Sequence, residues 1–119
     1  MPLLVFGEGE GFRRASFPDY LDAVKAIVSL VPPGRVTTYA SIARLLGVSP
    51  RLVGALLRAN DEPIVVPCHR VVRSNGELGG YSMGGPRVKR RLLELEGVGF
   101  DGKGRVRREY IVDVAGLIA

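Results

Sequence analysis

The sequence contains few of the residues that hold small proteins together through covalent or metal bonds. Its 119 residues include one cysteine, one histidine and no tryptophan. A single cysteine cannot form an internal disulfide, and one histidine with one cysteine cannot supply the three or four ligands of an ordinary zinc site. We therefore expect a fold that depends on a hydrophobic core, without a metal ion or an organic cofactor.

The sequence also lacks long apolar runs, internal repeats and low-complexity segments. A membrane-spanning helix needs about 20 consecutive apolar residues, and residues 1–6 lack the charged head of a secretory signal. Hydrophobic residues make up 46% of the chain and charged residues 24%, which is typical of a folded globular protein. These features predict one domain over residues 1–119, with a glycine-rich turn at 7–11, in an intracellular monomer that does not contact a membrane.

Negative charge is scarce in the middle of the chain. The whole sequence has 17 Lys and Arg residues against 12 Asp and Glu residues. Between Arg35 and Arg91, ten basic residues stand against three acidic ones. Such an excess attracts phosphate groups, as in DNA-binding proteins. The solvated, arginine-rich surface of a heat-adapted protein has the same pattern, so charge alone leaves both interpretations open.

Two adjacent short helices are predicted within this basic segment. Residues 37–47 have a threonine cap candidate in front and a glycine behind. Ser49 can cap a second helix, in which Pro50 suits the first position and residues 51–59 continue. Two short helices joined by a tight turn form a helix-turn-helix, whose second helix usually meets DNA, although proteins that never bind DNA also contain such pairs. Arg51 and Arg58, near the two ends of the second helix, would then lie near phosphates or bases.

Scaffold elements are predicted on both sides of this pair. Helical periodicity indicates a helix over residues 18–31 and another over residues 86–96. Residues 98–119 suggest a hairpin and a short strand over residues 110–112. The fold class is therefore mostly α with small β elements, in a winged-helix-like domain. The apolar residues expected to face the core are Leu21, Val24, Ile27, Val28 and Val31, then Val53, Leu56 and Leu57, then Val88, Leu92 and Leu95.

The single cysteine lies between two short apolar runs, at residues 64–66 and 71–72, which we expect to be buried. A free cysteine is most simply a small buried side chain. A histidine within reach of a thiol can generate the thiolate, which is the nucleophile, so His69 beside Cys68 also allows a reactive thiol. Glu96 is a candidate to orient the imidazole. Neighbours in sequence need not point together, so both interpretations stay open on these residues alone.

Several separated segments, in matching order and spacing, resemble the O6-alkylguanine-DNA alkyltransferase family. The resemblance extends over about residues 18–98, and separated motifs in register are more specific than one short pattern. It implies a DNA-repair protein that transfers an alkyl group from the O6 atom of guanine in double-stranded DNA to Cys68, with each molecule acting once. The segments are PPGRVTTY at 32–39, RLVG at 51–54, Asn60, PCHRV at 67–71 and GYS at 80–82.

The resemblance implies a catalytic group around Cys68. His69 and Glu96 match the pair that draws the proton from the thiol through a water. Tyr39 matches a tyrosine that helps to rotate the phosphate and donates a proton toward the departing guanine, which lowers the barrier in the transition state. Asn60 matches the asparagine that ties the recognition helix to the active-site turn by hydrogen bonds.

The resemblance also implies how DNA is bound. The target base is unreachable inside stacked DNA and must be flipped out, in this family through the minor groove. Arg51 matches an arginine that fills the gap left in the stack, and Ser82 matches a serine that hydrogen-bonds the O6 position. The other expected DNA contacts are Thr38, Tyr39, Gly54, Arg58 and Arg70. The base pocket is expected to include Pro67, Val71, Tyr81 and Ser82.

The chain differs from the family pattern in length and at single positions. Family members usually carry an N-terminal domain, and we expect that domain to be absent here. Short chains resemble the alkyltransferase-like proteins, which bind the lesion without transferring it and typically have tryptophan where this chain has Cys68. Met83 resembles an insertion in the lid of the pocket. Bulkier residues in the recognition helix, Leu52 and Leu56, and the replacement of a proline by Asp61 are further differences.

Two alternatives to alkyl transfer follow from these features. The first is a protein that flags O6-alkylguanine for other repair factors, which requires lesion binding independent of Cys68. The second is an ordinary helix-turn-helix regulator, which requires sequence-specific duplex binding and leaves residues 67–70 unexplained. Because the thiol of Cys68 is a nucleophile and the tryptophan of the alkyltransferase-like proteins is not, this residue favours transfer. We expect a cytoplasmic protein associated with the nucleoid. The sequence does not identify a repair protein that binds to it.

Overall fold

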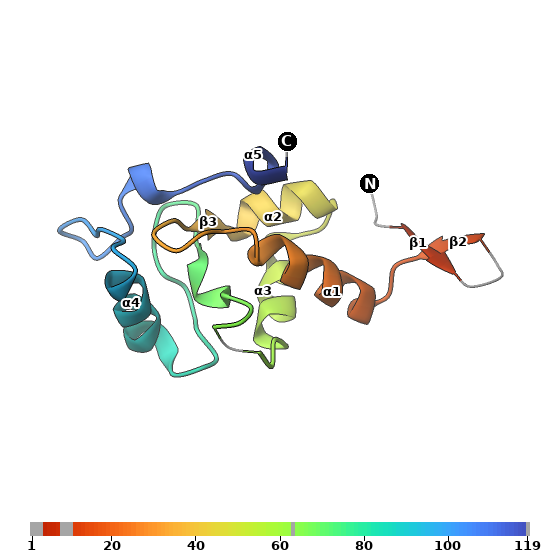
Figure 1. Cartoon of the computed structure of the whole chain (residues 1–119), viewed down its shortest axis with the longest axis horizontal. Helices are drawn as coiled ribbons and strands as arrows, with labels where there is room; N and C mark the ends of the chain where they lie inside the picture. The colour runs from red at the N-terminus through yellow and green to blue at the C-terminus, as the bar shows by residue number, and fades with distance from the viewer. Residues whose placement is uncertain (1–3, 8–10, 63, 119) are drawn as a thin grey trace.

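The computed structural model describes residues 4–7, 11–62 and 64–118 (Figure 1). Strands β1 (Leu4–Gly7) and β2 (Gly11–Arg14) form an antiparallel hairpin that projects from the rest of the molecule near the start of α1 (Figure 1). The expected glycine-rich turn at 7–11 includes residues 8–10, which lie outside the described residues.

Helix α1 (Phe17–Val28) is shorter than the predicted helix over residues 18–31. Its start is fixed by the Asp19 carboxylate, which accepts hydrogen bonds from the backbone and the hydroxyl of Ser16, both at 2.8 Å. At the other end Val31 precedes a proline, and a residue in that position is disfavoured in the α conformation. The chain therefore leaves the helix before Val31, although Val31 remains buried as expected.

The predicted helix-turn-helix is confirmed. Helix α2 (Tyr39–Leu46) begins at Thr38, whose side chain accepts a hydrogen bond from the first turn, and ends at Gly47 in the left-handed conformation with φ 70°. Helix α3 (Pro50–Arg58) follows, with the Ser49 side chain as its N-terminal cap. The axes of the two helices meet at 105°, within the range of helix-turn-helix pairs.

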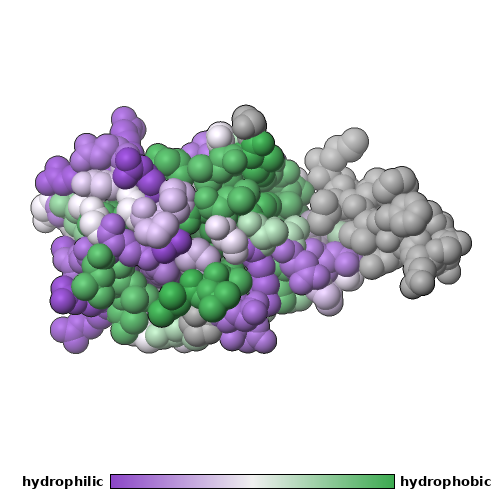
Figure 2. Space-filling view, in the orientation of Figure 1, coloured by the Kyte–Doolittle hydropathy of each residue, from purple (hydrophilic) through white to green (hydrophobic). Residues whose placement is uncertain are grey.

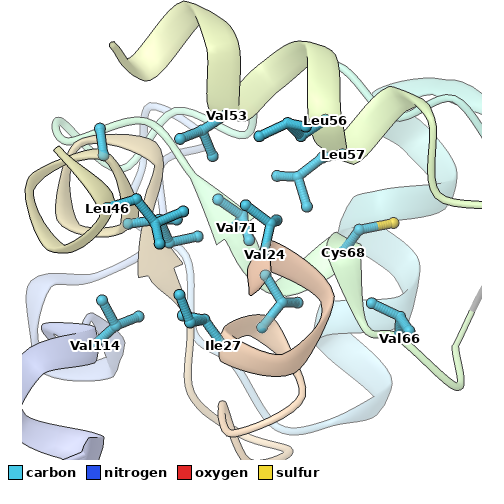
Figure 3. Packing of buried hydrophobic residues seen from close by; sticks show 13 residues of the cluster. Val24, Ile27, Leu46, Val53, Leu56, Leu57, Val66, Cys68, Val71 and Val114 are labelled. Atoms are coloured by element: carbon cyan, nitrogen blue, oxygen red, sulfur yellow. The ribbon is translucent and has the colours of Figure 1, made fainter. Parts of the chain in front are cut away.

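The main hydrophobic core lies between α1, α2 and α3, and the short helix α5 (Val114–Ile118) closes it against α2. Figure 3 shows the side chains of this cluster converging, with the sulfur of Cys68 at the edge of the group. The inward-facing residues expected for α3 are all buried, so that part of the apolar pattern is confirmed. The members of the cluster are Val24, Ile27, Val28, Ile42, Ala43, Leu46, Val53, Leu56, Leu57, Val66, Cys68, Val71 and Val114.

A second, smaller core lies beside the first, and a two-stranded parallel sheet joins the two. Strand β3 (Thr37–Thr38) pairs with β4 (Val71–Val72), and the two residues of β4 point into different cores. Cys68 lies in the 3-10 helix η1 (Cys68–Arg70), which leads directly into β4. The members of the second core are Val36, Val72, Leu93, Val98 and Val106.

Helix α4 (Gly85–Leu95) packs against η1, but the predicted inner face of α4 is wrong. The buried residues of this helix are Lys89 and Leu93, whereas Val88 and Leu95 are exposed. The expectation followed the apolar residues, and the helix instead turns a lysine toward the interior. The polar partners of that lysine are the Tyr39 hydroxyl and the Gly80 carbonyl, which an apolar pattern cannot reveal.

Residues 64–66 were expected to form a buried run, and this prediction is also wrong. Val66 is buried, but Ile64 is 63% exposed and Val65 is 77% exposed. Ile64 has a positive φ of 71°, an uncommon conformation for a β-branched residue. The segment is held mainly at Val66, whose carbonyl accepts a hydrogen bond from Asn60. Only that end of the run therefore reaches the core.

The C-terminal segment differs from the expected hairpin and strand. Phe100 and Val106 form one antiparallel bridge, and Ile111 forms one parallel bridge with Val36. A 3-10 helix, η2 (Arg108–Tyr110), ends at the first residue of the predicted strand at 110–112, and within that range only Ile111 forms a β-bridge. The prediction of a mostly α domain with small β elements is confirmed. Figure 2 shows hydrophilic residues gathered over the loop that follows α4 and hydrophobic residues over α2 and α5.

Among the described residues, no single helix has the length and apolar composition needed to cross a membrane. Helices α2 and α3 reach that length only when taken together, across their sharp bend.

Candidate functional site

A cavity of about 750 Å³, called here the main cavity, opens between α3, η1 and the segment that precedes α4. Cys68 lies in its wall and is 5% exposed, so its thiol is largely buried yet borders open space. The lid segment, defined as residues 79–82, forms the opposite wall. The lining residues are Tyr39, Ala40, Pro50, Arg51, Gly54, Leu57, Arg58, Cys68, Arg73, Ser74, Asn75, Gly79, Gly80, Tyr81 and Ser82.

Seven of the fourteen residues expected at the site line this cavity, and the other seven lie elsewhere. Cys68, Tyr39, Tyr81 and Ser82 line the cavity together with three expected DNA contacts from α3. Three of those outside the lining, Asn60, His69 and Glu96, are described below, and four more have other positions. Thr38 caps α2, Val71 lies in the main core, Pro67 is buried before η1, and Arg70 points toward α4.

The lining residues carry positive but no negative side-chain charge. Arg51 and Arg58 come from the two ends of α3, and Arg73 follows β4 on the other side. None of the described lining residues is an Asp or Glu. Cations grouped around a cavity attract anions, and phosphate groups are the common biological case.

His69, Arg70 and Glu96 form a compact ionic cluster behind Cys68. His69 Nε2 lies 3.1 Å from Glu96 Oε2. Arg70 donates to both carboxylate oxygens of Glu96, at 2.9 and 2.6 Å, and also to the carbonyl of Val31 at 2.9 Å. The guanidinium of Arg70 is therefore engaged inside the protein, in contrast to the DNA contact expected for it. Its bidentate pairing fixes the carboxylate that faces His69.

The protonation states in this cluster follow from burial and hydrogen bonding. Burial lowers the pKa of His69 below its ordinary value, although the hydrogen bond with Glu96 acts in the opposite direction. Burial would raise the pKa of Glu96, but hydrogen bonds from Arg70 and His69 outweigh it and lower that pKa. At neutral pH the cluster thus contains a neutral imidazole and an ionised carboxylate.

This arrangement selects one tautomer of His69. A neutral imidazole has one N–H donor, and the carboxylate of Glu96 can only accept, so Nε2 carries the proton. The other nitrogen, Nδ1, is then a free acceptor. It is buried and has no hydrogen-bond partner among the described residues. An unpaired buried acceptor next to Cys68 is an available base for a proton from the thiol.

Asn60 connects α3 to the segment that carries the cysteine. Its side chain donates to the carbonyl of Val66 at 3.2 Å and accepts from the backbone of Glu62 at 3.0 Å. Asn60 is buried at the end of α3, and the backbone N–H of Cys68 donates to that same carbonyl. The side chain therefore links the end of α3 to the turn that carries Cys68.

Sequence reasoning missed Lys89, which lies behind the cavity wall. Lys89 Nζ donates to the hydroxyl of Tyr39 at 3.3 Å and to the carbonyl of Gly80 at 3.2 Å. Burial raises the pKa of Tyr39. It also missed Arg73, Ser74 and Asn75 as lining residues. Apolar periodicity gave no signal for Lys89, because it assigns a lysine to the solvent face of a helix.

The described residues contain no group of three or more His, Cys, Asp or Glu side chains placed to hold a metal ion. The cavity wall offers one thiol, two phenols, two serine hydroxyls, one carboxamide and three guanidinium groups. Such a set suits a ligand with anionic and hydrogen-bonding groups.

Together, the fold and the site define a class of protein. It is a helix-turn-helix domain whose second helix borders a cavity, with a cysteine in the cavity wall that a buried histidine follows directly in the sequence. A family model described as the 6-O-methylguanine DNA methyltransferase DNA binding domain matches residues 19–98. The chain belongs to this family.

Individual relatives agree with the family assignment. The methylated-DNA–protein-cysteine methyltransferase of Methanothermobacter thermautotrophicus is 46% identical over 85 residues, covering 71% of this chain and 48% of the relative. The solved O6-methylguanine-DNA methyltransferase of Pyrococcus kodakaraensis shares 44% identity with a TM-score of 0.62, over 66% of this chain and 46% of the other. The chain thus spans about half the length of these relatives.

A shorter solved protein matches along almost its whole length. S. pombe Atl1, in complex with damaged DNA containing O6-carboxymethylguanine, is 27% identical with a TM-score of 0.69. The match covers 82% of this chain and 98% of Atl1. The same fold is therefore found both in the longer methyltransferases and in the shorter protein Atl1.

Proposed function

We propose that this chain repairs DNA by moving an alkyl group from the O6 atom of guanine to the sulfur of Cys68. The observation that carries the proposal is the position of Cys68 in the wall of the main cavity, directly before a histidine with a free, buried Nδ1. A cysteine with only a structural role would not have to border a cavity or lie next to a histidine with a free nitrogen. Membership of the methyltransferase family gives the substrate class.

Activation of the thiol starts at the ionic cluster. Glu96, held by Arg70, keeps the proton of His69 on Nε2 and leaves Nδ1 as the acceptor. The proton of Cys68 passes to Nδ1 through a water, which forms a thiolate and an imidazolium. The positive charge that develops on the ring is stabilised by the carboxylate of Glu96 at 3.1 Å.

Transfer then occurs in one displacement. The thiolate sulfur forms a bond to the alkyl carbon while the bond between that carbon and O6 of guanine breaks. The electron pair passes into the purine, and the Tyr39 hydroxyl at the cavity wall supplies a proton to the departing base. Ser82 hydrogen-bonds the O6 position, and Tyr81 forms part of the same lid segment.

The product is a thioether, which contains no bond that water hydrolyses readily. The site as described has no second nucleophile aimed at that bond, so each protein molecule acts once. The protein and the lesion are therefore consumed in equal numbers.

DNA binding is proposed for the face that α3 presents beside the main cavity. A guanine must leave the stack to reach Cys68, and Arg51 at the start of α3 occupies the gap. Arg58 contacts phosphates, and Gly54 allows the backbone to approach closely. Thr38 adds to DNA binding through its position at the start of α2. We leave Arg70 out of the contacts, because Glu96 and Val31 occupy its guanidinium.

The proposal also includes the expected partner, oligomeric state, lack of cofactors and location. Double-stranded DNA with an O6-alkylguanine is the one partner that the reaction needs, and a monomer is sufficient because all the groups named above come from one chain. No metal ion or organic cofactor enters the proposed reaction. The protein acts at chromosomal DNA, in the cytoplasm and at the nucleoid.

The test is the mass of the intact protein after incubation with a duplex containing O6-methylguanine. We expect a gain of one methylene unit per chain, with none after incubation with undamaged duplex. Cys68→Ala should bind the lesion duplex and show no gain. Tight binding of the wild-type protein at unchanged mass would reject transfer and indicate a lesion-binding protein instead.

A further inference from the structure

The loop between α4 and η2 carries positive charge that the proposed reaction does not use. This segment, residues 100–107, is called here the basic loop. It contains three Lys or Arg residues and one acidic residue. It lies beyond residues 19–98, the part of the chain that the family model matches. Hydrophilic residues gather over this part of the molecule (Figure 2). A surface with this charge attracts phosphate groups.

The basic loop is held in one shape by contacts within it and with α4. The carboxylate of Asp101 accepts hydrogen bonds from the backbone of Lys103 at 2.8 Å and of Arg105 at 3.0 Å. It also accepts from Nε of Arg105 at 3.2 Å. The guanidinium of Arg90 in α4 lies 4.4 Å from the centre of the Phe100 ring. The single acidic side chain of the loop therefore holds the turn from which Lys103 extends.

The basic loop packs against a turn that belongs to the main cavity. The backbone N–H of Val106 donates to the carbonyl of Gly76 at 2.8 Å. A Cβ atom on Gly76 would lie 2.7 Å from the carbonyl oxygen of Val106 and 3.3 Å from Cβ of Arg105, so only glycine fits there. Residues 73–75, directly before Gly76, line the main cavity. Lys103 is three residues from Val106, so the Cα atoms of these two residues are at most about 10 Å apart.

An open hollow of about 480 Å³ continues the main cavity toward the basic loop. Arg73 and two glycines of the lid segment line both spaces, and Gly104 of the basic loop lines the hollow. The acidic residue among its described lining residues is Glu77. The carboxylate of Glu77 accepts a hydrogen bond from Asn75 at 2.7 Å and lies 3.7 Å from the guanidinium of Arg73. A continuous surface thus leads from the main cavity to the basic loop.

We propose that the basic loop is a second DNA-binding element, in which Lys103 and Arg105 contact backbone phosphates that flank the flipped nucleotide. This inference rests on the proposed function, which places the duplex on α3 beside the main cavity. A duplex in that position extends past the cavity, and each strand carries one phosphate per 3.4 Å of the helix axis. Lys103 is exposed and has no hydrogen bond or ion pair from its side chain to another described residue.

The contacts of the basic loop position the duplex without recognising the lesion. Phosphates have the same charge at every base pair, so they carry no information about sequence or alkylation. Loss of a contact should therefore weaken binding to damaged and undamaged duplex alike. Because the loop is already ordered by Asp101 and Arg90, binding requires little further loss of conformational freedom.

The experiment measures binding to a labelled duplex with a central O6-methylguanine by fluorescence anisotropy at several salt concentrations. Every protein in the series, including the parent, carries Cys68→Ala, so that no transfer occurs during the measurement. Lys103→Gln removes the charge, and Lys103→Arg keeps it. Arg91→Gln is the matched control, because it also removes one exposed charge but from α4, outside the basic loop.

We expect Lys103→Gln to bind about three- to tenfold more weakly than the parent at low salt. The slope of log affinity against log salt concentration should become shallower by about 0.9, the value for one lost phosphate contact. Lys103→Arg should retain the affinity and the slope of the parent. Arg91→Gln should retain the slope of the parent as well, and the undamaged duplex should give the same order of variants.

A second series locates the contact along the DNA. The duplex is shortened either on the 5′ side or on the 3′ side of the lesion. The phosphates that Lys103 contacts are removed from only one of these two duplexes. The difference in affinity between Lys103→Gln and the parent should therefore disappear on that duplex and persist on the other.

Three results would overturn the inference: the same affinity and salt slope in Lys103→Gln as in the parent, an equal loss of slope in Arg91→Gln, or a difference that persists on both shortened duplexes. Circular dichroism confirms that each variant is folded. Methyl transfer by the protein with Cys68 is measured separately by mass. Absence of transfer would reject the proposed function, while the binding series still decides on the basic loop.

Discussion

Helices α3 and α4 both serve the candidate site, but they bury different kinds of side chain. Helix α3 buries three aliphatic residues, Val53, Leu56 and Leu57, and turns its arginines to the main cavity. Helix α4 buries Lys89 with one leucine and leaves Val88 and Leu95 exposed. Glu96, which follows α4 directly, reaches the ionic cluster behind Cys68.

The difference separates the source of stability from the source of chemistry. The hydrophobic effect holds α3 in place, because its apolar face belongs to the main core. Helix α4 contributes charged groups to the back of the site, and their effect depends on hydrogen bonds and on pH. Substitutions in α3 should therefore change stability at any pH, whereas substitutions in and just after α4 should change pH-dependent properties.

The largest effect is expected for an apolar truncation in α3. Leu56 is 0% exposed, and Leu56→Ala should lower the free energy of unfolding by about 2–5 kcal/mol. Leu95 on α4 is 68% exposed, so Leu95→Ala should change the free energy of unfolding by less than about 0.5 kcal/mol. Urea unfolding at pH 7 measures both. Equal losses in the two variants would contradict the contrast between the helices.

A smaller loss is expected when the charge that follows α4 is removed. Glu96→Gln keeps the shape of the side chain but leaves Arg70 without its ionic partner, which should cost about 1–3 kcal/mol of stability. The maximal rate of methyl transfer should fall as well, because His69 loses the carboxylate that stabilises its protonated form. Stability and transfer rate are measured on the same preparation. A variant with wild-type stability would contradict the structural role of this pair.

The ionic cluster should also make stability depend on acid pH. The pKa of His69 is lowered from 6.5 in the fold, so the unfolded chain binds more protons there, and stability declines as pH falls below 6.5. The pKa of Glu96 is lowered from 4.5, so its contribution is present above pH 4.5 and is lost as pH falls through the lower folded value. Urea unfolding between pH 7 and pH 3 should therefore show a shallower decline below pH 4.5 in Glu96→Gln. Equal slopes in both proteins would contradict the assignment.

The smallest effect is expected at the helix starts, where α3 and α4 also differ. The Ser49 hydroxyl accepts a hydrogen bond from the backbone of Leu52 at 3.1 Å, whereas α4 starts after Gly84 without a side-chain cap. Ser49→Ala should lower the free energy of unfolding by about 1 kcal/mol. Ser49→Asp should keep most of this contribution, because aspartate also caps helices. Thermal unfolding checks this, and an unchanged midpoint for Ser49→Ala would show that the cap does not contribute.

The same contrast explains which parts of the fold could be predicted from the sequence. The helix-turn-helix was predictable because local signals agree, with Thr38 and Ser49 as caps and Gly47 as a stop. The inner face of α4 could not be predicted in this way. The burial of Lys89 depends on Tyr39 in α2 and on Gly80 in the segment before α4, both outside the helix. No local pattern places a lysine next to those partners.

The candidate site was predictable to the extent that its residues lie in recognisable segments. Cys68 and His69 were predicted from residues 67–71, and Glu96 was a candidate partner of the imidazole that the family resemblance also indicated. The structure places the Glu96 carboxylate 3.1 Å from the imidazole. The engagement of Arg70 by Glu96 and the exposure of Val65 were not foreseen. The first depends on tertiary contacts of Arg70 with Val31 after α1 and Glu96 after α4, which local composition does not show.

The most direct test of transfer to Cys68 is peptide mapping after reaction with a duplex that carries a deuterated methyl group on O6 of guanine. The protein is digested, and the label is located and counted by tandem mass spectrometry. We predict one label per protein molecule, on Cys68 alone, together with restored guanine in the duplex. A label on another residue, or a bound duplex that keeps its methyl group, would contradict the account.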